Sequence, residues 1–174
     1  MLRPFGPSDL APLAALNAHP SVVEWVGLSL TRAESDALVE RLSAELEREG
    51  WGSWAVEVIG GEAFIGMVGL NRVKPSYPFA PAVEVGWRLD PTHWGQGYAT
   101  EAAAASLSYG FETGGLAEIV SFTATANVRS QSVMERIGMV RDPAADFDHP
   151  SLPEVSPLRR HVLYRARPGR RERG

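Results

Sequence analysis

Two glycines, Gly95 and Gly97, stand just before a segment with strong helical periodicity, and they are the first sign of chemistry in this sequence. The first turn of a helix has backbone N–H groups that lack internal partners and carry partial positive charge. A glycine turn lets a ligand approach that backbone closely. The run Trp94, Gly95, Gln96, Gly97, Tyr98 and Ala99 therefore predicts a cradle for a pyrophosphate, with a plain tight connection as the alternative.

The cradle matches neither of the two common phosphate-binding fingerprints. A dinucleotide-binding turn has three glycines early in a βαβ unit, whereas here the third glycine is missing and the turn falls mid-chain. A P-loop needs Lys followed by Ser or Thr after its last glycine, and Gly97 is followed by Tyr98. The pattern thus indicates another class of phosphate-bearing ligand.

Alternating helical and strand patterns surround the cradle. Helices are predicted after Ser8, after a capping box at Thr31–Glu34, over residues 98–113 and after Asn127 as N-cap. Strands are predicted at residues 54–59, 64–70, 83–89, 117–125 and 158–165, the first two joined by a hairpin turn at 60–61. The Pro-rich segments 74–81 and 142–157 are expected to be loops.

Composition describes an ordinary globular chain with an uneven charge distribution. The 174 residues fit one domain, with 44% hydrophobic and 22% charged residues and no Cys, which excludes disulfides and a Cys nucleophile. The last ten residues hold five Arg and one Glu, so the body before them has 12 basic and 20 acidic residues and a charge of −8. That charge suits a cationic substrate or serves solubility alone. We expect one domain over 1–166, a basic disordered tail over 167–174, no membrane segment and a cytoplasmic location.

Three motifs together resemble the GNAT superfamily of N-acetyltransferases. They are Gly-Trp-Arg-Leu-Asp-Pro at 86–91, Trp-Gly-Gln-Gly-Tyr-Ala-Thr-Glu-Ala at 94–102, and Asn-Val-Arg-Ser at 127–130 leading to Glu-Arg-Ile-Gly-Met at 135–139. Their order and spacing resemble the RimJ/RimL-like branch, the ribosomal-protein N-terminal acetyltransferases, in which Trp is common at the position of Trp94. The resemblance covers residues 1–165.

The resemblance implies a single α/β (α+β) domain: a mixed sheet of about six or seven strands, splayed in the middle and flanked by about four helices. It implies acetyl-CoA as co-substrate, with pantetheine between the strand of Trp87 and Leu89 and the strand of Thr123. The pyrophosphate would lie on the cradle, and Asn127 and Ser130 would lie near the thioester. The activity implied is direct acetyl transfer to a primary amine, either a protein N-terminus or a small molecule.

The catalytic residues are Glu84, Asn127 and Ser130 on this interpretation. Glu84 would act as general base through water, because the attacking amine must lose a proton; the alternative is an ion pair with Arg88, its neighbour on the same strand face. Met134 stands where many GNAT enzymes have a Tyr that protonates the departing thiolate. Ser130, Ser132 or solvent would take over that role.

Four side chains could line the acceptor pocket: Tyr77, Phe79, His149 and His161, with ordinary packing as the alternative for each. No ligand set has metal-binding spacing, so no metal is expected. A homodimer is possible.

Two other classes of function stay open. A GNAT fold that binds acyl-CoA without transfer would be a sensor or partner module, for which the missing Tyr is the argument. Binding of nucleic acid through the Arg tail is the other, and the acidic body argues against it.

Overall fold

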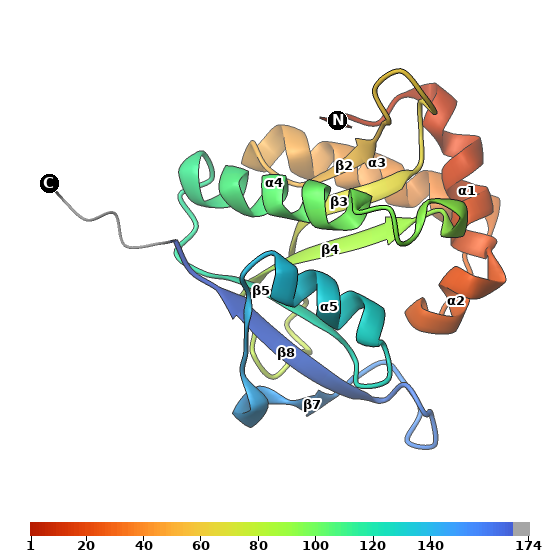
Figure 1. The fold of residues 1–174 in the computed structure, drawn as a ribbon. Helices are drawn as coiled ribbons and strands as arrows, with labels where there is room; N and C mark the ends of the chain where they lie inside the picture. Colours follow the sequence, from red (N-terminus) through yellow and green to blue (C-terminus); the bar gives the residue numbers. More distant parts are fainter. Residues whose placement is uncertain (169–174) are drawn as a thin grey trace, which may run out of the picture.

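The computed structural model describes residues 1–168 as one mixed sheet with helices on both faces (Figure 1). The strands follow the order β1-β2-β3-β4-β5-β8-β6, and β7 pairs with β8. Their bounds are β1 Leu2–Arg3, β2 Ser53–Val56, β3 Gly66–Arg72, β4 Val83–Leu89, β5 Ile119–Ala124, β6 Val140–Arg141, β7 Phe147–Asp148 and β8 Arg160–Ala166. The α-helices are α1 Leu10–Ala18, α2 Pro20–Val26, α3 Arg32–Glu49, α4 Tyr98–Glu112 and α5 Val128–Arg136. Short 3₁₀ turns lie at Pro7–Asp9, Pro91–His93 and Pro143–Ala145.

The two faces of the sheet bury different apolar stripes. On one face α4 packs over β3 and β4, placing Ala103 and Leu107 in the same core as Val85 and Ile119. On the other face α1 and α3 contribute Leu13, Leu16 and Val39 to a second core. Figure 1 shows α4 and α5 in front of the sheet and α3 behind it. Alternation along a strand therefore sends neighbouring residues of β4 into different surroundings.

The sheet divides between β4 and β5. These two strands are parallel, and their pairing is registered at Glu84 opposite Val120 alone. β3 and β4, by contrast, are paired over seven residues, and β5 and β8 over six. Beyond Glu84 the two strands separate toward their carboxyl ends, where α4 and α5 begin (Figure 1).

The expected fold class is confirmed, with more elements than expected: the described part of the chain has eight strands and five α-helices. The capping box is present, since the Thr31 hydroxyl accepts from the Glu34 N–H at 3.3 Å. α4 ends at Glu112 instead of 113, and β8 is one to two residues later than expected.

Short elements account for the differences from expectation. No local pattern indicated β1, β6 and β7, which have two residues each and form only by pairing with distant strands. Helix α2 begins at Pro20, with proline at the first helical position and the His19 ring accepting from Ser21 N–H at 3.2 Å. The expected strand 54–59 is shortened to 53–56, and the expected strand 64–70 keeps its length but is shifted to 66–72, because residues 57–65 connect the two strands.

Arg167, the first residue of the expected tail, forms an ion pair with Glu118 at 2.8 Å. Residues 169–174 of that tail lie outside the described residues. Among residues 1–168, no helix is long and apolar enough to cross a membrane.

Candidate active site

The separation of β4 from β5 leaves backbone groups of β4 facing an open edge. The Val85 carbonyl accepts a hydrogen bond from the Ser121 hydroxyl at 2.9 Å, so odd-numbered residues of β4 point their peptide groups toward β5. The peptide groups of even-numbered residues point toward β3. The hydrogen bond from Asp90 N–H to the Ile65 carbonyl, at 2.8 Å, continues this pattern just beyond the end of β4. Trp87 therefore directs its N–H and C=O into the gap, after strand pairing has ended.

The predicted cradle lies at the carboxyl end of β4, at the start of α4. Gly95 and Gly97 have φ of 77° and 88°, a conformation that other residues adopt only with strain. A Cβ at either position would meet no protein atom within 4 Å, so the space in front of the turn is open.

A run of backbone donors faces that space. No protein acceptor within residues 1–168 bonds the N–H groups of residues 95–100, and Gly97 provides no side-chain cap. The N-terminus of a 15-residue helix adds its partial positive charge at the same point. The site can therefore bind a phosphate or pyrophosphate through the backbone alone.

Side chains of the cradle hold it in place. The Trp94 indole N–H donates to the Leu89 carbonyl at 2.8 Å, and its ring packs against both cores. The Gln96 amide donates to the Thr92 carbonyl at 3.0 Å. The guanidinium of Arg129, from α5, lies 5.3 Å from the Trp94 ring centroid. Trp94 and Gln96 thus hold the loop through bonds to backbone carbonyls that precede it in the chain. Arg129, from α5, places a cation next to the loop.

Asn127 begins α5, as its pattern predicted. Its side-chain oxygen accepts from Ser130 N–H at 3.2 Å, and its amide donates to the Thr123 hydroxyl at 3.1 Å. Both Asn127 and Ser130 are half-buried beside the carboxyl end of β5. The pair therefore links the start of α5 to the strand that borders the gap.

Glu84 forms the one register pair between β4 and β5, opposite Val120. Burial raises the pKa of its carboxyl to about 7, and the charge of Lys74 acts weakly against this rise. The expected alternative, an ion pair with Arg88, is not formed, because Arg88 donates instead to the Asn17 side-chain oxygen. A carboxyl with a pKa in this range can take up a proton near neutral pH, which is what a general base requires.

The four predicted pocket residues are brought together beside Glu84, on the face away from α4. The Tyr77 hydroxyl lies 2.7 Å from His149 Nε2, and the His149 and His161 rings lie 4.9 Å apart. Phe79 packs against the Tyr77 ring at 5.6 Å between centroids. Burial, with the nearby charge of Glu84 as a smaller cause, raises the pKa of Tyr77 to about 12.

The two histidines of this cluster are held neutral by their surroundings. Burial lowers the pKa of His161 to about 4, and it lowers the pKa of His149 as well. His161 is 7% exposed, whereas His149 is more open to solvent. His161 therefore packs as a neutral ring, and His149 together with Tyr77 forms the polar part of the wall.

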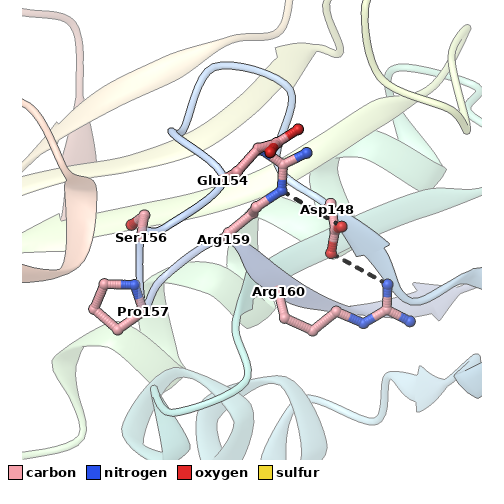
Figure 2. Close-up of a pocket in the computed structure, with 6 residues that line it drawn as sticks. All are labelled: Asp148, Glu154, Ser156, Pro157, Arg159 and Arg160. Atoms are coloured by element: carbon pink, nitrogen blue, oxygen red, sulfur yellow. Dashed lines mark hydrogen bonds and ion pairs between the residues drawn. The ribbon is translucent and has the colours of Figure 1, made fainter.

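The long loop after β7 adds a charged hollow of about 440 Å³ (Figure 2). Its two arginines, Arg159 and Arg160, both pair with Asp148, at 3.4 and 3.3 Å. The same loop reaches the end of α2, where Leu152 approaches the Cβ position of Gly27 within 3.1 Å. The loop and α2 thus enclose the same side of the molecule.

Met134, at the position where many relatives have a tyrosine, is 1% exposed and belongs to the main core. Its thioether has no proton to donate, so the residue serves packing. The described residues contain no group of three or more potential metal ligands.

Three residues of the site were missed by sequence reasoning: Ser121, Arg129 and Asn17. Arg129 could have been found, because it lies inside the quoted motif at 127–130, as the second residue of the predicted helix after Asn127. Ser121 and Asn17 carry no local signal, because their partners are 36 and 71 residues away.

A mixed sheet that separates between two parallel strands, with an anion cradle at the carboxyl end of one of them, is the α/β arrangement that the GNAT resemblance implied. The sequence matches the family described as "Acetyltransferase (GNAT) domain" over residues 1–140. The chain therefore belongs to the GNAT acetyltransferase family.

Similar proteins agree with this assignment. The FsC-acetyl coenzyme A-N(2)-transacetylase of Aspergillus fumigatus is 32% identical over 145 residues, which are 79% of this chain and 61% of the fungal protein. An acetyltransferase from Agrobacterium tumefaciens has a TM-score of 0.75 at 30% identity, with 95% and 88% of the two chains covered. The ribosomal-protein-S5-alanine acetyltransferase of Vibrio fischeri has a TM-score of 0.76 at 20% identity, covering 95% and 91%, and shares the fold.

Proposed function

We propose that this protein is an N-acetyltransferase that moves an acetyl group directly from acetyl-CoA to a primary amine. The observation that carries the proposal is the position of Glu84. Glu84 lies where β4 and β5 separate, three residues before Trp87 on the strand that leads to the cradle. A proton acceptor, unpaired backbone groups of β4 and an anion site thus lie along the gap between β4 and β5.

Acetyl-CoA would supply an acetyl group already activated as a thioester. The N–H groups of residues 95–100 fit its pyrophosphate, and Arg129 offers a cation beside them. The Trp87 and Leu89 backbone would hold the extended part, although the Leu89 carbonyl already accepts from Trp94. Trp94 would contribute through its backbone and its hold on the loop.

Glu84 would prepare the acceptor for attack. An ammonium group cannot act as a nucleophile, so it must first pass a proton to the protein or to water. A carboxyl with a pKa of about 7 can take that proton near neutral pH, directly or through a water. The N–H of Trp87 would stabilise negative charge that develops on the acetyl oxygen.

The departing sulfur needs a proton donor other than residue 134. Ser130 lies at the start of α5, and its hydroxyl has no hydrogen-bond partner within the described range. We assign it that role, with Ser132 or solvent as the alternatives. Asn127 positions this turn through its bonds to Ser130 and Thr123.

The acceptor would be a protein N-terminus or a small amine. The motif resemblance to the RimJ/RimL-like branch and the shared fold of the ribosomal-protein acetyltransferase support a protein N-terminus. The fungal relative, whose name gives acetyl coenzyme A as donor and an N(2) position, supports a small amine. Tyr77, Phe79, His149 and His161 would form part of the acceptor wall.

A binding module without transfer is the second candidate, and the burial of Met134 in the core is the observation that favours it. Both candidates require acetyl-CoA binding at the cradle. Only the enzyme releases CoA in the presence of an amine.

Calorimetric titration with acetyl-CoA tests the cradle, followed by a CoA-release assay over a panel of amines. We expect binding by the wild type and its loss in the Asn127→Ala, Gly97→Val double variant. Gly115→Val is the matched control, because Gly115 also has a positive φ, 64°, with open space, but lies beyond the other end of α4. Absence of binding by the wild type would refute the proposal, and binding without CoA release would select the binding module.

A further inference from the structure

Arg88 is a half-buried cation without a carboxylate partner among residues 1–168. Among residues 1–168 its guanidinium has one hydrogen-bond partner, the side-chain oxygen of Asn17, and it forms no ion pair. Burial lowers the pKa of Arg88, with no acidic group acting in the opposite direction. Arg3 and Arg165 show the contrast, since each contacts two carboxylates, with ion pairs of 2.7 to 2.8 Å.

The surroundings of Arg88 hold it in a fixed place. Asn17 is 1% exposed, and its amide donates to the Ser35 hydroxyl at 2.8 Å. This bond leaves the Asn17 oxygen free for the guanidinium and ties α1 and α3 to β4. A desolvated guanidinium with unused donors is costly, and a carboxylate is the ligand whose geometry matches its planar fork.

Open space separates Arg88 from Glu84. The two side chains leave β4 on the same face, with Gly86 between them. A Cβ at Gly86 would meet no protein atom within 4 Å, so the strand is uncovered there. Four strand residues place the two Cα atoms about 13 Å apart, so a small molecule can reach both side chains.

The partner of Arg88 would come from the acceptor side of the sheet. Its contact with α1 lies on the face opposite α4, whose N-terminus forms the cradle. The phosphates of the co-substrate would be bound by the backbone N–H groups of residues 95–100 and by Arg129, so they do not need Arg88. A carboxylate on the acceptor is the remaining candidate.

We propose that the acceptor is an amine that also carries a carboxylate, and that Arg88 binds this carboxylate while Glu84 receives the amine over Gly86. This inference rests on the proposed acetyl transfer and names its substrate class. Arg88 is then the residue that determines specificity. The local pair of charges selects a zwitterion even though the body of the chain is acidic.

The test compares matched acceptors: aminocarboxylates of increasing length and their amides, and tripeptides with Glu or Gln at the second position. CoA release gives kcat/KM for each. For at least one matched pair we expect the wild type to prefer the carboxylate about 10- to 100-fold, as for a charged hydrogen bond. The small-molecule and peptide arms identify the source of the carboxylate.

Variants separate recognition from folding. Arg88→Gln is expected to lower kcat/KM for the carboxylate acceptor to that of its amide, and to leave the amide unchanged. Arg88→Lys should restore part of the preference. Arg72→Gln is the matched control, because Arg72 lies on the adjacent strand but pairs with Glu49 at the surface. Equal preference in the wild type, or an equal loss on both acceptors in Arg88→Gln, would overturn the proposal.

Binding gives a readout that does not depend on transfer. We expect calorimetry to detect the preferred aminocarboxylate, or 5-aminopentanoate if none is acetylated, with the wild type and about tenfold more weakly with Arg88→Gln. If binding is seen without acetylation, the proposed reaction fails while the site stands. A weaker acetyl-CoA affinity in Arg88→Gln, with acceptor binding unchanged, would assign Arg88 to the co-substrate and refute the inference.

Discussion

Glu84 shows how one strand position acquires reactivity from its surroundings. Glu84 is half-buried near Tyr77 and has no ion pair within the described chain, so desolvation of its carboxyl raises the pKa to about 7. The identity of the residue allowed the hypothesis of a general base. The choice between a base and an ion pair depended on Arg88, which turns toward Asn17.

Glu84→Gln is expected to lower kcat/KM by about 100- to 10,000-fold, the usual loss when a general base is removed. In the wild type kcat/KM should rise with pH through about 7, because the base acts when its proton is gone. Steady-state rates from pH 5.5 to 9 check both points. Glu112→Gln, at the exposed end of α4, is the control. An unchanged rise through pH 7 in Glu84→Gln would contradict this role.

The same pKa predicts a stability effect of Glu84→Gln. A carboxyl with its pKa raised from 4.5 to about 7 binds more protons in the folded state, so wild-type stability falls as pH rises between these values. Glutamine carries no such penalty. Relative to wild type, the variant should gain about 3 kcal/mol in free energy of unfolding from pH 4.5 to pH 8. Urea unfolding at both pH values measures this, and a constant difference would contradict it.

At the scale of elements, two helix N-termini define the site. α4 begins without a side-chain cap, whereas α5 begins with Asn127 capping Ser130 and binding Thr123 of β5. A helix start that lacks a cap keeps its donors for a ligand. A capped start fixes its first turn against the strand. Both features belong to local motifs, which explains why the sequence already indicated them.

Asn127→Ala should lower the free energy of unfolding by about 1 kcal/mol through loss of the cap. Asn127→Asp should keep the cap and most of the stability, because aspartate is an equally good N-cap. Thermal unfolding and kcat/KM of both variants separate two roles. If the Asn127→Asp variant keeps its stability but loses activity, the amide itself is used in the reaction; retention of both leaves capping as the whole role.

At the scale of the whole molecule, the sheet consists of two halves that meet along β4 and β5. One register pair and the bond from Ser121 to the Val85 carbonyl join the strands at this boundary. The acceptor wall combines Tyr77 and Phe79, from the loop between β3 and β4, with His149 and His161 of the C-terminal half, while Arg88 and Asn17 belong to the N-terminal half. The site therefore exists only when the halves are joined.

Ser121→Ala should cost about 1 kcal/mol of unfolding free energy, because a buried carbonyl loses its partner. Hydrogen exchange should accelerate most in β4 and β5, where the halves meet. Ser106→Ala is the matched control: Ser106 is also buried, but its hydroxyl bonds only to the Ala102 carbonyl of its own helix. A similar change in both variants would show that Ser121 has no special role at the boundary.

Features that depend on neighbours along the chain could be predicted from the sequence alone. The glycine cradle, the capping box at Thr31, the N-cap at Asn127 and the alternation of β4 are all local, since each follows from backbone preferences within a few residues. The family and the order of its motifs followed from the same segments.

The acceptor side, by contrast, was decided by tertiary contacts. Tyr77 meets His149 from a loop 72 residues away, and Arg88 meets Asn17 across 71 residues. Such contacts depend on how the sheet separates and on which loops cross it. The types of the side chains do not indicate which residues, some 70 positions apart in the chain, will meet. The four side chains of the proposed acceptor wall could be proposed from the sequence by residue type, whereas their meeting in space and the missing carboxylate partner of Arg88 became visible only in the folded chain.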